Sequence, residues 1–260
     1  MGRWGHRLFE HDEAIHQAVE ISKDISQGNG LHFAHLMAYA LASSPVGVRE
    51  YYDGEYAITK WLGPDASQPL LDNIIRDKLD AGLGAALFAK YRAREDEAED
   101  FGGRLKLRSV ILAAMMMRHG AGISEEDEQH VRELVPKLQC SEVWVSPLGD
   151  EGFRGPGKRQ FLAALDNYQA GKPRDFEQPS CHNCGKVNAD IKAEGKVLMK
   201  CGGCKNGKAA AWFCDKDCQK NLWKYHKQGN CGDPRGRGFA TFKGYGKTGG
   251  GVMLYEGSMV

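Results

Sequence analysis

The chain has 260 residues, 42% hydrophobic and 27% charged, which is ordinary for a globular protein with one medium and one small domain. No stretch approaches the roughly 20 apolar residues that span a bilayer, and no apolar secretory segment is visible, so we expect a cytoplasmic and/or nuclear protein without membrane contact. The net charge of +1 is unevenly distributed, because residues 181–260 hold 14 Lys and Arg against 6 Asp and Glu.

Apolar residues recur with a helical period over most of residues 1–170, which are therefore predicted to form an all-helical domain. Glycine or proline follows several of these periodic segments, as expected where a helix ends. The expected helical segments, in chain order, are residues 14–25, 31–42, 51–62, 71–79, 83–99, 105–118, 124–138 and 160–168. The predicted fold class is mostly α, with a small module and a glycine-rich tail after the helices.

The segments around these helices carry turn and cap signals. In residues 124–127 a serine stands three residues before an aspartate, which resembles the capping box that opens a helix, with Asp in place of Glu or Gln. Residues 143–145 are expected to form a short strand or an extended segment, and residues 149–157 a glycine-rich loop. Residues 171–180 are predicted to be a linker. Residues 232–260, with nine glycines among 29 residues, are predicted to be a basic tail.

Seven of the eight cysteines lie between positions 181 and 231. Without a secretory signal, clustered cysteines are more often metal ligands than disulfide partners. One histidine completes a set of eight, which is the number of ligands that two tetrahedral zinc sites need. The candidate ligands are Cys181, Cys184, Cys201, Cys204, Cys214, Cys218, His226 and Cys231.

The spacing of these residues supports a zinc-binding module. The two C-x2-C pairs, which begin at Cys181 and Cys201, each direct two thiolates at one ion. Cys214, Cys218 and His226 follow a four-residue step that places them on one side of a helix. A segment of about 50 residues buries too little apolar surface to fold unaided, so zinc is expected to supply most of its folding free energy.

The second half of this module contains, in order, Phe213, Cys214, Cys218, Gln219, Trp223, His226, Lys227 and Cys231. Together with the two preceding C-x2-C pairs, this pattern resembles a MYND zinc finger over residues 181–231. The 16 residues between the two C-x2-C pairs are more than usual in that family and imply an extended loop.

The resemblance implies a cross-brace, in which the ligand pairs alternate between two ions, although the sequence alone permits other pairings. One zinc would be held by Cys181, Cys184, Cys214 and Cys218, and the other by Cys201, Cys204, His226 and Cys231. Because protein ligands fill all eight positions, none is left for water or substrate. We therefore expect two structural Zn²⁺ ions and no enzyme.

MYND fingers are protein-interaction modules that take short proline-containing peptides, and residues matching Gln219 and Trp223 line the peptide groove in that family. The flat indole of Trp223 suits a proline ring, and proline segments are pre-extended and lose little entropy on binding. The alternative is that Trp223 belongs to the small core of the finger. The resemblance thus implies an adaptor protein, such as a transcriptional co-regulator or a ubiquitin-ligase adaptor.

Two other functions are compatible with parts of the sequence. Cations alternate with aromatic residues in 235–245, a composition that binds single-stranded nucleic acid by stacking and charge. Some lysine methyltransferases also carry a MYND finger, but the Asn-His-Ser-Cys segment of their SET domain is absent here. We therefore favour a protein partner over nucleic acid, and expect neither methyltransferase activity nor a small-molecule substrate.

Overall fold

The computed structural model describes residues 7–27, 34–42, 44, 46–58, 60, 68–96, 104–138, 155–204 and 210–229. The predictions for residues 143–145 and for the tail at 232–260 lie outside this set, as does Cys231. Among the described residues, no helix combines the length and the apolar character needed to cross a bilayer.

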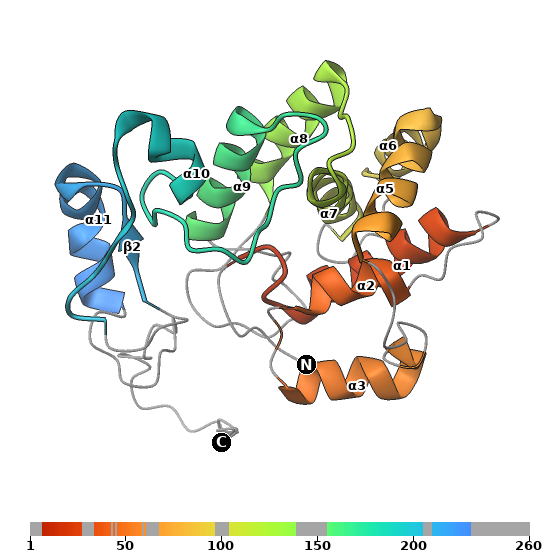
Figure 1. The fold of residues 1–260 in the computed structure, drawn as a ribbon, viewed down its shortest axis with the longest axis horizontal. Helices are drawn as coiled ribbons and strands as arrows, with labels where there is room; N and C mark the ends of the chain where they lie inside the picture. Colours follow the sequence, from red (N-terminus) through yellow and green to blue (C-terminus); the bar gives the residue numbers. More distant parts are fainter. Residues whose placement is uncertain are drawn as a thin grey trace.

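The described chain is mostly helical, as the sequence predicts, and a small finger follows the helices (Figure 1). The helical domain contains α1 (Asp12–Ser26), α2 (Ala34–Leu41), α3 (Val46–Tyr56), α5 (Gln68–Lys78), η1 (Leu79–Leu83), α6 (Gly84–Arg92), α7 (Arg104–His119), α8 (Glu125–Lys137) and α9 (Gly155–Asn167). The finger contains α10 (Asn188–Ile191), η3 (Lys192–Glu194), β1 (Met199–Lys200), β2 (Trp212–Phe213) and α11 (Lys216–Gly229).

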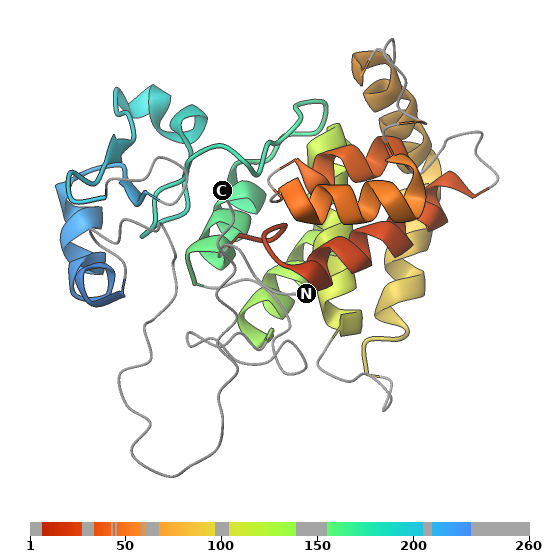
Figure 2. The ribbon, with the colours of Figure 1, turned by 90° about the horizontal axis from the view of Figure 1, so that it is seen from below.

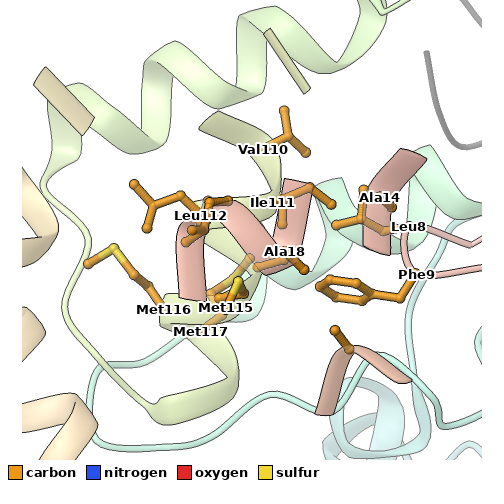
Figure 3. Close-up of a cluster of buried hydrophobic side chains, with 14 of the residues drawn as sticks. Leu8, Phe9, Ala14, Ala18, Val110, Ile111, Leu112, Met115, Met116 and Met117 are labelled. Atoms are coloured by element: carbon orange, nitrogen blue, oxygen red, sulfur yellow. The ribbon is translucent and has the colours of Figure 1, made fainter. Parts of the chain in front are cut away.

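Helix α7 lies at the centre of the helical domain, where α1, α5, α6 and α8 pack against it. Residues 109–119 of this helix are all buried, because apolar side chains occupy nearly its whole circumference. Figure 3 shows Ile111 and Met115 of α7 beside Ala14 and Ala18 of α1. Both alanines are fully buried, and their small side chains let the two helices approach closely.

Helix α8 begins at the cap that its sequence predicts. The Ser124 hydroxyl accepts a hydrogen bond from the Asp127 backbone N–H at 3.1 Å and donates one to the Asp127 carboxylate at 2.7 Å. In a full capping box, the longer Glu side chain reaches the backbone N–H of the cap residue. Asp127 also accepts a hydrogen bond from Arg92 at 3.1 Å, so this cap joins α8 to α6.

Helices α5 and α6 run into each other through the π-helical turn η1, in which Gly82 has a φ of 110°. Helix α6 ends at Arg92, and residues 93–96 form turns, so the prediction of a helix to residue 99 is wrong at this end. The buried Glu95 carboxylate lies 2.9 Å from the His130 imidazole of α8. This contact draws the chain after Arg92 toward α8, so the helix does not continue.

Helix α9 begins at Gly155, inside the segment that the sequence predicts as a loop. Pro156 lies in its first turn, where the missing N–H breaks no helical hydrogen bond and the fixed φ suits the helix. The Gly-Pro-Gly sequence therefore opens the helix, and only its first residues were assigned to the wrong element.

Residues 171–180, for which the sequence predicts a linker, pack against the helical domain. The Phe176 ring is buried, stacks on Phe161 with 6.2 Å between centroids, and meets the edge of Phe9 at 6.3 Å. The Arg174 backbone N–H donates to the Met117 carbonyl at 2.8 Å. The chain is thus anchored to the helical core directly before the finger begins.

The finger docks on α9, at the side of the molecule away from α5 and α6 (Figures 1 and 2). The Arg159 guanidinium of α9 donates to the His182 carbonyl at 2.8 Å. Arg174 makes a two-pronged ion pair with the buried Asp190 carboxylate of α10, at 2.6 and 2.7 Å. Such bidentate geometry is among the stronger forms of ion pair, so the finger has a defined seat on the helical domain.

Candidate metal centre

The two short strands of the finger bring its ligand pairs together. In the antiparallel pair, Met199 faces Phe213 and Lys200 faces Trp212. Cys201 directly follows β1, and its backbone N–H donates to the Ala211 carbonyl at 2.8 Å. Cys214 follows β2, so the hairpin carries one ligand of each predicted site.

The first C-x2-C pair forms a tight knuckle. The Gly185 N–H donates to the Cys181 carbonyl at 2.7 Å, and the Cys181 N–H donates to the Lys186 carbonyl at 2.8 Å. The His182 N–H donates to the Trp212 carbonyl at 2.8 Å, which joins this knuckle to β2. These bonds turn the Cys181 and Cys184 side chains to the same side of the chain.

The remaining ligands lie on or next to α11. Asp215 precedes this helix, and its carboxylate accepts a hydrogen bond from the Cys218 backbone N–H at 2.8 Å, as an N-cap side chain does. The cap holds Cys214 and Cys218 with 3.3 Å between their sulfurs. His226 lies two further four-residue steps along α11, on the side that faces the hairpin.

The first cluster consists of four thiols whose sulfurs all lie within 4.8 Å of one another: Cys181, Cys184, Cys214 and Cys218. The Cys184 and Cys214 sulfurs are 3.7 Å apart. A tetrahedral zinc ion with bonds of about 2.3 Å separates its sulfur ligands by about 3.8 Å. The number, chemistry and spacing of these donors therefore fit one zinc ion with a closed ligand set.

The second cluster consists of Cys201, Cys204 and His226, all of which are buried. The His226 Nε2 lies 3.4 Å from each of the two sulfurs. Three ligands leave one position of a tetrahedral ion, and the predicted fourth, Cys231, lies outside the described residues. The two clusters divide the seven described ligands in the way that the family resemblance implies.

The electrostatics of the first cluster call for a cation. The thiol of Cys184 hydrogen-bonds to Cys181 and lowers the pKa of Cys181 to about 4, while the same bond raises the pKa of Cys184. Burial raises the pKa of Cys214 to about 12 and also raises the pKa of Cys218. A single thiolate is thus favoured among the bare side chains, because the Cys184 thiol stabilises it by a hydrogen bond and burial disfavours further negative charge. A divalent cation would allow all four sulfurs to ionise together.

The His226 ring is ready to act as a ligand. Burial lowers its pKa, so the imidazole is neutral at physiological pH and has a lone pair for a metal. The Phe213 ring lies edge-on to it at 5.8 Å and fixes its position. Around the clusters the finger has only a small apolar core, which includes Ile191 and Leu198. This is consistent with a fold that depends on metal ligation.

The two predicted peptide-contacting residues lie one turn apart on α11. Trp223 is 39% exposed, and its ring centroid is 5.9 Å from that of His226. Gln219 is half-buried. The indole therefore rests partly on a metal ligand while part of it faces solvent, and the peptide contact itself stays a prediction.

Several supporting residues were missed at the level of sequence. Asp215 stands three residues before Cys218, a spacing typical of an N-cap, so a capping argument could have found it. The Asn183 amide donates to the Cys218 sulfur at 3.5 Å, and no sequence pattern signals that contact. The pairing of Arg174 with Asp190 likewise depends on how α10 of the finger packs against residues 171–180.

Comparisons with known proteins agree with this geometry. Residues 181–229 match the family model of the MYND finger. A SET and MYND domain-containing protein of Dictyostelium discoideum is 42% identical over 48 residues, which cover 18% of this chain and 8% of that protein. The N-lysine methyltransferase SMYD2 of Gallus gallus is 34% identical over 92 residues, which cover 34% of this chain and 20% of that protein. No solved structure matches the chain significantly.

These matches confirm the predicted family of the finger, and they concern only part of the chain. The chain spans a fifth or less of each curated relative. MYND fingers generally mediate protein–protein interaction, and the two Cys/His clusters indicate zinc binding.

Proposed function

Because residues 181–229 form a MYND finger, we propose that this chain is an adaptor protein of the cytoplasm or nucleus. Its finger, folded around two structural zinc ions, would bind short proline-containing segments of other proteins. The observation that carries this proposal is the closed cluster of four thiols within 4.8 Å of one another. A zinc ion with four protein ligands has no position for substrate, so the site shapes a surface and catalyses no reaction.

In the proposed holo protein, bound zinc supplies folding free energy to a finger with little apolar core. Cys181, Cys184, Cys214 and Cys218 would hold one ion, and the other would be held by Cys201, Cys204, His226 and Cys231. The ligand residues also position the elements of the finger. Cross-braced ligation fixes α11 against the β1–β2 hairpin and leaves the Trp223 indole partly open to solvent.

Trp223 and Gln219 are the proposed peptide-binding residues. An exposed indole offers a flat apolar surface, and a proline ring can pack on it without further loss of backbone freedom. Gln219, one turn away on α11, can hydrogen-bond a peptide carbonyl through its amide. The partner would therefore present an extended, proline-containing segment.

The test is a comparison of partners captured by the full zinc-loaded chain and by its Trp223→Ala variant. We expect Trp223→Ala to lose proline-containing partners by at least tenfold in affinity, since a central aromatic anchor typically contributes 2 kcal/mol or more, roughly a thirtyfold effect. Lys192→Ala, an exposed change on η3, is the matched control and should bind normally.

Metal analysis must accompany this comparison. Two zinc ions per chain in the variant, together with lost binding, would support a role of the indole in recognition. Unchanged partners in Trp223→Ala would contradict the proposal. A zinc content well below two in the wild-type protein would contradict the closed-site argument on which it depends.

The names of the two curated relatives raise a second candidate, protein lysine methylation. The matched segments cover no more than a fifth of those proteins, so their activity is not carried over to this chain, and the adaptor function remains our proposal. The discriminating assay incubates the full chain with S-adenosylmethionine and protein substrates and measures methyl transfer. Methylation that survives in Trp223→Ala and in zinc-loaded material free of contaminating enzymes would overturn the adaptor assignment.

A further inference from the structure

The finger carries more positive charge than its own acidic residues can pair. Residues 181–229 contain ten lysines and only four acidic residues. Each of these acids already has a cationic partner: Asp190 pairs with Arg174, Glu194 with Lys186 and Lys196, Asp215 with Lys196, and Asp217 with Lys220. Two Zn²⁺ ions with seven thiolates would add a net charge of −3, so residues 181–231 keep a net charge of about +3 that anions from outside the finger can pair.

Three of the lysines share one face of α11 with the exposed tryptophan. Lys216, Lys220, Trp223 and Lys227, which we call the α11 stripe, follow one another at intervals of four, three and four residues. Because an α-helix has 3.6 residues per turn, these intervals keep them on one side of the helix. All four side chains are exposed, whereas the metal ligands of α11 face the clusters on another side.

The lysines of the stripe are weakly engaged. Lys216 and Lys227 have no ion pair with any residue that the structure describes. Lys220 has a 3.7 Å contact with Asp217, and both side chains are more than three-quarters exposed. Solvent screens such a pair strongly, so Lys220 can turn to another carboxylate at little cost.

Building on the proposed function, we propose that the proline-containing segments bound at Trp223 carry Asp or Glu on both sides of the proline. A segment in the polyproline conformation rises about 3.1 Å per residue, so a position two residues from the proline lies about 6 Å away. Lys220 and Lys227 lie about 4.5 Å and 6 Å from Trp223 along the helix axis. A peptide that runs along α11 would thus bring flanking carboxylates next to these ammonium groups.

The exposed apolar side chains of the finger favour a peptide over a nucleic acid. Proteins that bind single strands stack successive bases on successive aromatic rings. Among the finger side chains that the structure describes, Trp223 is the one exposed aromatic, and the other large exposed apolar residues are Val197 and Met199. These two aliphatic side chains can pack against peptide side chains but offer no ring on which a base could stack.

The test uses the full zinc-loaded chain and three pools of short labelled peptides with a central proline. The residues two positions before and after the proline are fixed as Asp, Asn or Lys, and the other positions are mixed. By fluorescence anisotropy, we expect the Asp pool to bind roughly tenfold more tightly than the Asn pool. This is the combined effect of two exposed ion pairs, each of which contributes about threefold. This advantage should shrink between about 0.1 M and 1 M salt.

Substitutions in the α11 stripe test whether its lysine charges cause the preference for acidic peptides. The triple variant Lys216→Gln, Lys220→Gln, Lys227→Gln should bind the Asp and Asn pools equally, with its zinc content unchanged. The control Lys192→Gln, Lys200→Gln removes exposed lysines outside α11 and should keep the preference for the Asp pool.

Three other outcomes of these binding experiments would each contradict a specific part of the proposal. Equal binding of the Asp and Asn pools by the wild-type chain would overturn the acidic preference and leave the proposed function standing. Failure of all three pools to bind would overturn the proposed function and the preference together. Tighter binding of a single-stranded oligonucleotide, lost in the triple variant, would assign the stripe to nucleic acid and overturn the peptide inference.

Discussion

The Asp215 carboxylate stabilises the start of α11 through two contacts. It accepts the Cys218 backbone N–H at 2.8 Å and pairs with Lys196 at 3.3 Å. The bond from Cys218, followed by the attraction of Lys196, lowers the pKa of Asp215, so the carboxylate is ionised at neutral pH. These contacts hold Cys214 and Cys218 in one cluster.

We predict that Asp215→Ala destabilises the folded finger by about 1 kcal/mol, the usual cost of losing a helix N-cap. The variant should also release zinc to a competing chelator more readily, because Cys218 is less well positioned. Chelator competition followed by absorbance measures this effect. The control is Asp217→Ala, whose side chain is 87% exposed and makes only a loose contact. Equal zinc release by the two variants would contradict the capping role.

At the scale of elements, the docking of the finger on α9 depends on a glycine. Gly185 has a φ of 80°, and a Cβ at this position would lie 1.9 Å from the Arg159 carbonyl oxygen. That distance is far below van der Waals contact and involves backbone, which cannot rotate away. The knuckle of the first cluster therefore touches α9 only because residue 185 lacks a side chain.

We predict that Gly185→Ala lowers the free energy of unfolding by clearly more than Gly195→Ala. Gly195 also has a left-handed φ, of 68°, but no heavy atom lies within 4 Å of the Cβ it lacks. Gly195→Ala therefore reports backbone strain alone, about 1 kcal/mol, and the difference between the variants reports the contact with α9. Urea denaturation measures both, and similar losses would argue against the close contact.

Local sequence patterns predict which segments form helices, whereas long-range contacts determine where some of those helices end. The apolar period predicted α1 and α7, and the serine cap predicted the start of α8, because these signals lie within a few residues. The predicted end of α6 is wrong because Glu95 contacts His130 of α8, and a local pattern cannot reveal that contact. Likewise, the spacing of the cysteines and the histidine predicts which residues form the metal clusters. The ion pair of Arg174 with Asp190 depends on tertiary packing and has no such local signal.

At the scale of the whole molecule, the helical domain and the finger have separate interiors. The buried apolar residues of the helical domain form one cluster, centred on α7, and those of the finger form another around the cysteines. Phe176, from the segment between them, belongs to the helical cluster. Only the finger interior contains the metal ligands.

We therefore predict that chelation of zinc under reducing conditions unfolds residues 181–229 and leaves the helical domain folded. Hydrogen exchange should show lost protection in β2 and α11 and retained protection in α7. Circular dichroism should retain most of the helical signal. Adding zinc back should restore exchange protection in the finger. Lost protection in α7 after chelation would show that the two interiors fold as one unit.

The ion pair of Arg174 with Asp190 and the close contact of Gly185 with α9 also determine the direction in which the finger presents a bound partner. A recognition module on a slack tether samples many orientations, whereas one fixed to its neighbour points in a single direction. A peptide bound at Trp223 would therefore leave the finger along a set line relative to α9. A partner with a second contact on the helical domain would gain high effective concentration only if its own spacing matched that line.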